Sequence, residues 1–178
     1  MKKVAVVDNV LLVSSPLGDI RLAAAEISDS QSQDNGQIAL TGLHFVGQKY
    51  YPSDSDGLPA KGESLQFLRR VEKALEAYFL TGKDMQKFTL APRGTPFQQS
   101  VWQGLLKLTS GQTITYGQLA NRIGNAAAVR AAAAAVGRNP ISLIIPCHRI
   151  IGADGSLTGY AGGLERKSRL LAIEKGAL

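Results

Sequence analysis

The residues best suited to covalent chemistry lie in the segment Ile144–Ile151, which reads IIPCHRII. Cys147 is the only cysteine among the 178 residues, and His148 and Arg149 follow it directly. An unperturbed cysteine, with a pKa of about 8.5, is only a few per cent ionised at neutral pH. His148 is placed to take the thiol proton, and the positive charges of His148 and Arg149 would favour the thiolate. The alternative is a structural cysteine, because free cysteines are among the most buried residues.

A working pair of Cys147 and His148 needs a particular backbone, since neighbouring residues of a strand point to opposite faces. A turn or a bridging water must bring the two side chains together, and Pro146 is typical of a break in a strand. A histidine base also needs an orienting partner. Spacing does not choose among the three acidic residues of the second half, which are Asp154, Glu165 and Glu174.

Composition limits the classes of protein to consider. One cysteine excludes an intramolecular disulfide, and no Cys/His cluster has zinc-ligand spacing, so we expect neither a metal nor a cofactor. No stretch approaches the roughly 20 apolar residues of a membrane span. Met1, Lys2 and Lys3 suggest the start of a signal peptide, but Asp8 and Asn9 interrupt the apolar run too early. We therefore expect a cytoplasmic protein without a membrane partner.

Charge divides the chain unevenly. Residues 1–93 carry 11 Lys and Arg against 11 Asp and Glu, whereas residues 94–178 carry 9 against 3, which accounts for the whole net charge of +6. A basic half beside a neutral one favours a polyanionic partner, with nucleic acid first. The alternative is a basic surface that serves solubility alone.

Strands and turns should form the first part of the chain and one helix should follow them. Residues 9–26 contain two apolar runs broken at Pro16–Asp19, which predicts a hairpin. Residues 38–46 predict a further strand between polar loops at 28–37 and 51–59. Residues 63–81 have helical periodicity, and Gly82 is the expected stop. The apolar stripe of this predicted helix consists of Leu68, Val71, Leu75 and Tyr78. Residues 83–94, which follow the helix, resemble a linker.

The second half predicts a succession of helices. Two capping boxes, residues 95–98 and 115–118, mark helix starts. The first of these helices has a core face of Phe97, Val101, Leu105 and Leu108. The second should end at Gly124, and Asn125 is suited to cap the next helix, so the pair makes a helix-turn-helix pattern. Residues 126–136 are eight Ala, two Val and Arg130. They indicate either a tightly packed helix or one thin enough for a nucleic-acid groove.

Together these motifs resemble one known family. The box Pro146–Arg149, the upstream pair Asn139-Pro140 and the downstream Gly159–Gly163 are similar to motifs of the O6-alkylguanine-DNA alkyltransferases, also called methylated-DNA–protein-cysteine methyltransferases. SPLGDIRLAA resembles the family's first hairpin, and TPFQQSVWQGLLKLTSGQTITYGQLA its entry into the C-terminal domain. Residues 1–93 match more loosely than the rest.

The resemblance implies a fold class of α/β plus α. Residues 1–90 would form a ribonuclease-H-like sheet-and-helix domain with a linker, and residues 91–178 a mostly helical winged helix-turn-helix domain. The implied function is DNA repair by single-turnover transfer of the alkyl group of O6-alkylguanine to Cys147, with the base flipped out of the duplex. The partner would be double-stranded DNA containing O6-alkylguanine, bound by a monomer. Activity on O4-alkylthymine, preference among alkyl groups and cooperativity on DNA stay open.

The resemblance also assigns roles in catalysis. Cys147 would be the alkyl acceptor, His148 the base acting through a water, and Glu174 its orienting partner. Asn139 would hold the turn between the recognition helix and the active-site strand. Tyr116 would help to protonate the leaving guanine and would crowd the target phosphate.

Further implied roles concern DNA and the guanine pocket. Arg130 would fill the stack once the base has left, and the groove-facing small residues would be Ala128, Ala131 and Ala133, which suit a minor groove only about 6 Å wide. Tyr160 would line the pocket, with Lys167 close to it. Residue 161 is Ala where some members have Ser, which leaves tolerance of bulky alkyl groups open. The zinc-binding cysteines of the bifunctional members are absent.

Two other functions remain as alternatives. One is a lesion-sensing relative that binds DNA without repair, but those proteins lack the acceptor cysteine. The other is a cysteine hydrolase that uses Cys147, His148 and Glu174 and turns over.

Overall fold

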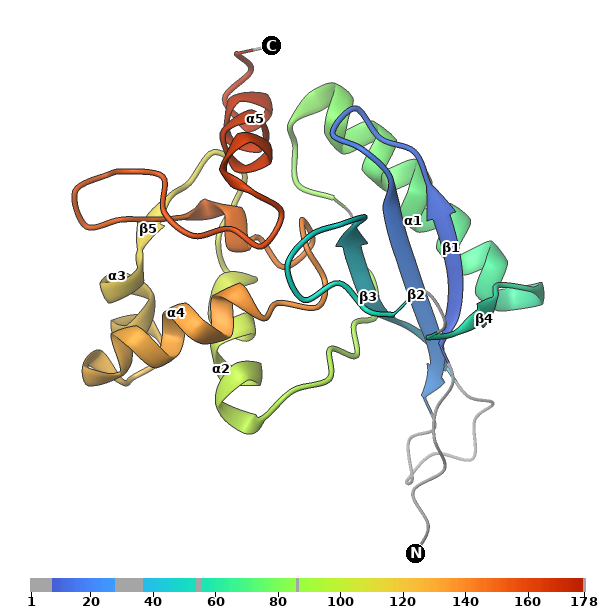
Figure 1. Cartoon of the computed structure of the whole chain (residues 1–178), viewed down its shortest axis with the longest axis horizontal. Helices are drawn as coiled ribbons and strands as arrows, with labels where there is room; N and C mark the ends of the chain where they lie inside the picture. The colour runs from blue at the N-terminus through green and yellow to red at the C-terminus, as the bar shows by residue number, and fades with distance from the viewer. Residues whose placement is uncertain (1–7, 28–36, 54–55, 86, 178) are drawn as a thin grey trace, which may run out of the picture.

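A computed structural model describes residues 8–27, 37–53, 56–85 and 87–177 of the chain. A sheet covered by one long helix forms the first half, and shorter helices with long connecting loops form the second (Figure 1). The coarse class is α/β with a mixed sheet, as expected. The chain start that suggested a signal peptide and most of the predicted loop 28–37 lie outside the described residues.

The sheet has the strand order β3-β2-β1-β4, with β1 antiparallel to β2, β2 antiparallel to β3, and β1 parallel to β4. The bounds are Asn9–Val13 for β1, Ile20–Ile27 for β2, Gln37–Phe45 for β3 and Leu58–Pro59 for β4. The predicted hairpin is confirmed, and Gly18 takes a φ of 104° in its turn, which suits a residue without Cβ. β4 lies inside the segment 51–59 that was expected to be a loop.

Helix α1, Gly62–Thr81, lies against one face of the sheet and buries the predicted apolar stripe (Figure 1). It ends as expected at Gly82, which has a φ of 66° and whose N–H donates to the carbonyl of Tyr78. The backbone of Ile173 leaves no room for a Cβ at Gly82. This glycine therefore serves both the helix end and the close approach of the C-terminal helix.

The second half contains the expected helices with one difference. Its elements are α2 Pro96–Leu105, β5 Ile114–Thr115, α3 Tyr116–Arg122, η1 Ala126–Ala128, α4 Val129–Gly137, η2 Cys147–Arg149, β6 Ile150–Ile151 and α5 Leu164–Glu174. Both capping boxes form, at Thr95 and Thr115. The segment 126–136 is not one helix, because its first three alanines make a 3-10 turn and Asn125 makes no side-chain cap bond.

The two halves share backbone pairing and one apolar core. The edge of β3 forms bridges between Leu40 and Leu90 and between Leu43 and Ile141. The segment expected to be a linker therefore partly extends the sheet. A single cluster of buried apolar side chains runs from β2 and α1 to α2 and α5. The second half is thereby positioned by the sheet.

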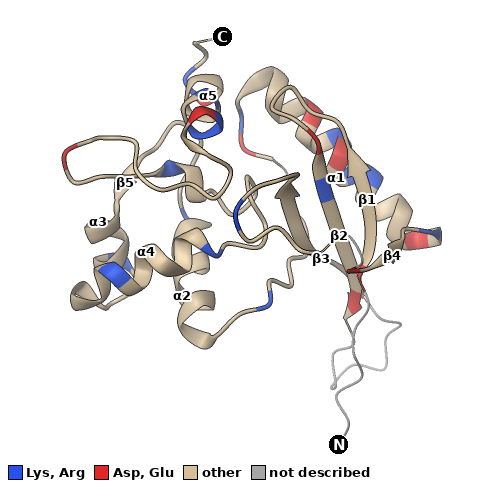
Figure 2. Ribbon diagram, viewed as in Figure 1, with Lys and Arg blue, Asp and Glu red and all other residues tan. Residues whose placement is uncertain are grey.

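Charged residues follow the division seen in the sequence. Figure 2 shows that the ribbon positions of Asp and Glu are concentrated on the sheet and α1 and are sparse around α2, α3 and α4. Within the described residues, no helix combines the length and apolar character that crossing a membrane requires.

Candidate active site

The segment that carries the thiol is a turn. Leu143 takes a φ of 69°, unusual for a bulky residue, and Cys147–Arg149 form the 3-10 turn η2 after Pro146. The predicted break in the strand is confirmed, and the active-site strand implied by the resemblance begins only after the cysteine, at β6. The turn places the Cys147 and His148 side chains, both buried, without a direct hydrogen bond between them.

Asn139 ties this turn together from just beyond α4. Its Nδ2 donates to the carbonyl of Ile145 at 2.7 Å and to Sγ of Cys147 at 3.0 Å. Its Oδ1 accepts from the N–H of Ile141 at 3.0 Å. Asn139 is buried, so each of these bonds replaces one that water would have made. The side chain thus fixes both ends of the segment before the thiol and touches the sulfur itself.

Burial raises the pKa of the Cys147 thiol above its usual range. The hydrogen bond from Asn139 and the positive charge of Lys167 oppose that rise. The expectation that His148 and Arg149 supply the favourable charge is wrong. Burial lowers the pKa of His148, so the imidazole is neutral, and the Arg149 charge is held by two carboxylates. In the resting protein the cysteine is a thiol.

Glu174 is the carboxylate that reaches His148. Its Oε1 lies 2.7 Å from Nε2 of His148, and neither side chain has any exposed surface. Nε2 therefore carries the proton, and Nδ1 is left without a partner in the described part of the chain. The other two acidic residues of this half lie elsewhere: Asp154 bonds Ser156 in an exposed turn, and Glu165 is exposed.

The same carboxylate holds several other groups. Arg149 reaches both oxygens of Glu174 at 2.8–3.1 Å, and the Tyr78 hydroxyl donates to Oε1 at 2.9 Å. The N–H of Gly111 donates to Oε2 at 3.0 Å. Burial alone would raise the pKa of Glu174, but the hydrogen bonds from His148 and Arg149 outweigh it and hold the pKa at about 2.

Arg149 is itself almost fully buried and needs further partners. Its guanidinium also binds Asp84 at 2.7 Å and the carbonyl of Leu108 at 2.6 Å. Sequence reasoning missed the parts played here by Tyr78 and Asp84. Tyr78 was assigned to an apolar stripe and Asp84 to a linker, and no local signal marks either one.

Lys167 is a second buried cation near the thiol. Its Nζ donates to the carbonyls of Ile150 and Thr158, and its side chain has no exposed surface. Burial lowers its pKa to about 8, against the opposing effect of Cys147. Lys167 thus joins β6, which directly follows η2, to the loop that contains Tyr160.

Two tyrosines are associated with this loop: Tyr116 contacts it from α3, and Tyr160 is part of it. Tyr116 opens α3, and its hydroxyl lies 3.4 Å from the carbonyl of Thr158. Tyr160 is held beside Ser142, and its hydroxyl makes no hydrogen bond of good geometry within the described residues. Burial and the nearby Cys147 raise the pKa of Tyr160 well above its usual range. Ala161, half buried, accepts from the N–H of Lys49.

Helices α3 and α4 form the helix-turn-helix that the sequence predicted. The inner face of α4 packs on α2, where Trp102 Nε1 donates to the carbonyl of Ala135 at 3.0 Å. Arg130 is exposed and makes no ion pair with any described residue. Of the three alanines assigned to the groove, Ala131 is exposed, while Ala128 and Ala133 are half covered.

The arrangement defines a class of site: a buried thiol and a histidine–carboxylate pair behind a helix-turn-helix. Within the described residues, no group of three or more His, Cys, Asp or Glu is placed to hold a metal ion.

Comparisons with known proteins agree with this class. Residues 96–176 match the family model described as 6-O-methylguanine DNA methyltransferase, DNA binding domain. The chain is 50% identical over 163 residues to a methylated-DNA–protein-cysteine methyltransferase of Methanosarcina acetivorans, covering 92% of this chain and 96% of that one. It is 43% identical over 166 residues to the protein of that name from Mycobacterium tuberculosis, covering 92% and 90%.

The fold of the chain is also similar to that of a relative whose structure has been solved. The crystal structure of Mycobacterium tuberculosis OGT in complex with DNA superposes with a TM-score of 0.79 at 38% identity, covering 95% of this chain and 94% of that one. The chain belongs to the methylated-DNA–protein-cysteine methyltransferase family.

Proposed function

We propose that the protein repairs DNA directly, by moving the alkyl group of O6-alkylguanine to Sγ of Cys147. The observation that carries this proposal is the constellation at η2: a buried thiol bonded to Asn139, next to a buried His148 that is paired with Glu174. The names of the relatives and their coverage of the whole chain support it. This geometry supports the proposal that the site roles implied by the resemblance apply to this chain.

The proton path follows from the tautomer of His148. Because Nε2–H is bonded to Glu174, Nδ1 is an acceptor, and we propose that it takes the thiol proton through a water. A sulfur lone pair then forms the S–C bond while the C–O6 bond breaks and its electrons stay on guanine. Guanine must gain a proton, and Tyr116 is the donor that borders the site. The proton held by His148 then returns to the Tyr116 phenolate through solvent. The net result is transfer of one proton from sulfur to guanine and one alkyl group from oxygen to sulfur.

Two groups stabilise the thiolate as it forms. The amide of Asn139 already touches the sulfur, and Lys167 places a cation nearby. Both are buried, so their effect on an anion is larger than it would be in water. This arrangement keeps a protonated thiol at rest and lowers the cost of ionising it when substrate is bound.

Flipping of the damaged nucleotide is part of the proposal. O6 of guanine lies on the pairing edge inside the duplex, where the buried Sγ of Cys147 has no access. Extrusion costs a few kcal/mol, and Arg130, exposed on α4, is the side chain proposed to support the opened stack. We also propose that a monomer performs the reaction, with division near residue 90 into a ribonuclease-H-like domain and a winged helix-turn-helix domain.

Stoichiometry tests the function. Attack on an alkyl carbon gives a thioether, which has no carbonyl for water to attack, so Cys147 cannot be regenerated by His148. Limiting protein mixed with excess O6-methylguanine duplex should repair one lesion per molecule. Peptide mapping should place the methyl group on Cys147, and Cys147→Ala should be inert. Product in molar excess over protein, or hydrolysis of an ester with turnover, would instead support the hydrolase.

A further inference from the structure

An exposed tyrosine of the first half, Tyr50, lies against two cations, one of which is Arg138 at the end of α4. Tyr50 is 50% exposed, and Nζ of Lys49 lies 5.1 Å from the centroid of its ring. The guanidinium carbon of Arg138 lies 5.0 Å from the same centroid. Lys49 and Arg138 are exposed, and neither makes an ion pair with a described residue. Two unneutralised positive charges are thus held together by an aromatic ring.

The backbone around Tyr50 is fixed. Tyr50 takes a φ of 62°, which is rare for a bulky residue and persists only where the surroundings enforce it. The buried side chain of Gln48 accepts from the N–H of Phe45 at 2.9 Å, and the carbonyl of Gln48 accepts from the N–H of Tyr51. The N–H of Lys49 donates to the carbonyl of Ala161, in the loop that also contains Tyr160, at 2.9 Å. The segment around Tyr50 is therefore held in a defined conformation next to the loop that contains Tyr160 and Ala161.

The exposed face of the helix-turn-helix leads to this loop. Ala131, Ala134 and Arg138, the residue that caps the end of α4, follow one another at intervals of three or four residues, and all three are exposed. Residues at that spacing share one face of a helix. A partner that follows the row of small side chains along α4 meets Arg138 at its end and then Tyr50 and Lys49.

We propose that Lys49, Tyr50 and Arg138, here called the Tyr50 clamp, bind the phosphate backbone of DNA beside the damaged nucleotide. The inference rests on the proposed function and extends the DNA interface from the helix-turn-helix onto the first half of the chain. Lys49 and Arg138 contact phosphate oxygens, and the Tyr50 ring keeps the two side chains in place before DNA arrives. Preorganised cations bind phosphate with a smaller loss of side-chain entropy.

The charges favour DNA over a second copy of the protein as the occupant. A protein surface that covered the clamp would have to place carboxylates against both cations. DNA presents a phosphate on each strand about every 3.4 Å of helix axis. The row of alanines on α4 leads a nucleic acid to the clamp, and small side chains allow close approach of a groove.

Salt dependence of binding tests the clamp. The probe is an unmodified duplex that accommodates one copy, titrated between 50 and 200 mM salt, a range over which phosphate contacts dominate affinity. Lys49→Gln and Arg138→Gln should each lower the slope of log affinity against log salt by about 1. Tyr50→Leu keeps both charges, so its slope should change little while Kd rises about two- to fivefold.

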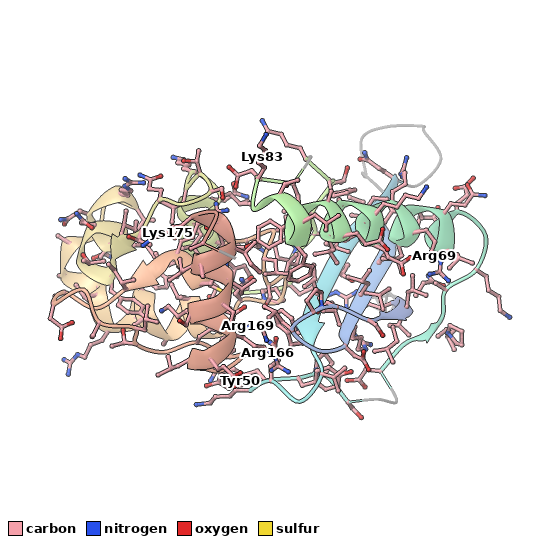
Figure 3. The ribbon with its side chains drawn as sticks, turned by 90° about the horizontal axis from the view of Figure 1, so that it is seen from above. Tyr50, Arg69, Lys83, Arg166, Arg169 and Lys175 are labelled. Carbon is pink, nitrogen blue, oxygen red and sulfur yellow. The ribbon has the colours of Figure 1, made fainter. Side chains whose placement is uncertain are left out.

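Lys83→Gln is the matched control. Lys83 is exposed on the opposite side of the molecule from Tyr50, as Figure 3 shows, and its loss removes the same charge. Slopes for Lys49→Gln and Arg138→Gln equal to that of Lys83→Gln would overturn the clamp. Losses that occur only on a duplex long enough for several copies would also overturn it and assign the surface to contact between copies.

A DNA-free reaction separates the clamp from the function. Transfer from free O6-benzylguanine to Cys147 needs no phosphate contact, so it should proceed at the parent rate in all clamp variants. A parent that transfers no methyl group from an O6-methylguanine duplex to Cys147 would refute the proposed function, whereas a parent active on that duplex with unchanged slopes in its variants would refute the clamp alone. Because Lys49 and Arg138 are exposed, their variants should keep the fold even if Tyr50→Leu does not.

Discussion

His148 and Glu174 form a hydrogen-bonded pair from which solvent is excluded, with 2.7 Å between Nε2 and Oε1 and no exposed surface on either side chain. The same carboxylate neutralises the buried Arg149 and accepts from Tyr78. One side chain therefore orients the proposed base and also compensates a buried cation. Changes at Glu174 should alter reactivity and stability together.

Replacing Glu174 with Gln should lower both the stability of the fold and the rate of transfer, and the pH dependence of the rate distinguishes the second effect from the first. Breaking a buried ion pair costs roughly 3–5 kcal/mol, so the free energy of unfolding should fall by about that amount in urea titrations. His148 becomes a weaker base without the carboxylate, so transfer should slow at neutral pH and recover as rising pH ionises the thiol directly. Glu165→Gln, exposed on the same helix, is the control. A pH–rate profile equal to the parent's would remove Glu174 from the proton path.

Replacing Asn139 with Ala should shift the pH–rate profile upward. Asn139 lowers the pKa of Cys147 by bonding to its sulfur, so its loss raises that pKa and reduces transfer at neutral pH. The buried N–H of Ile141 also loses its side-chain partner, at about 1–3 kcal/mol, whereas the carbonyl of Ile145 still accepts from the N–H of Cys147 at 2.8 Å. Asn125→Ala is the control, since Asn125 makes no cap bond. Loss of stability without a shifted profile would leave Asn139 a purely structural role.

Replacing Arg130 with Ala should slow repair of duplex DNA far more than transfer from free O6-benzylguanine. Arg130 is exposed on α4 whereas Cys147 is buried, and a free base needs no flipping. Single-turnover rates on both substrates check this, with Arg169→Ala on α5 as the control. Equal losses on the two substrates would contradict a role in opening the duplex.

His44 should make the fold sensitive to mild acid. Burial, followed by the charge of Arg21, lowers the pKa of His44 from 6.5 to about 4. Between pH 6.5 and pH 4 the unfolded chain therefore binds a proton at His44 that the folded chain does not bind. The free energy of unfolding consequently falls as pH decreases from 6.5 toward 4. Between pH 8 and pH 5 this linkage amounts to about 2 kcal/mol.

His44→Phe keeps a ring against Tyr51 and removes the titration. Urea unfolding at pH 8 and pH 5 should show the variant losing about 2 kcal/mol less than the parent over that interval. His148 contributes to both proteins and cancels in the comparison. An identical pH dependence in parent and variant would show that His44 titrates alike in both states.

Much of this organisation was predictable because its signals are local. The capping boxes at Thr95 and Thr115, the glycine stop at Gly82 and the hairpin turn each lie within a few residues, and each forms as the sequence indicates. The proline before Cys147 likewise marked the turn. The motif resemblance selected Glu174 where spacing alone did not, and the structure places it on His148.

The rest of the site depends on contacts between distant segments. Asp84 meets Arg149 across 65 residues, and Tyr78 meets Glu174 across 96. The residues next to Asp84 and Tyr78 in the sequence contain no pattern that predicts these distant partners. The sequence also suggested that the pKa of Cys147 is lowered, because the positive charges of the adjacent His148 and Arg149 would stabilise a thiolate. In the structure burial raises that pKa, because burial keeps His148 neutral and the charge of Arg149 is paired with carboxylates.

The bridges along β3 have a consequence for damaged or spent molecules. The carbonyl of Leu43 accepts from Ser142 and its N–H donates to Pro140, while Leu40 is paired in the same way with Thr89 and Ala91. An uncovered edge strand is a template on which a second chain can add. When the segment around Ile141 detaches from β3, the unpaired backbone groups of that strand are exposed and can pair with a strand of another molecule. Such a molecule should precipitate with like chains before the rest of its fold is lost.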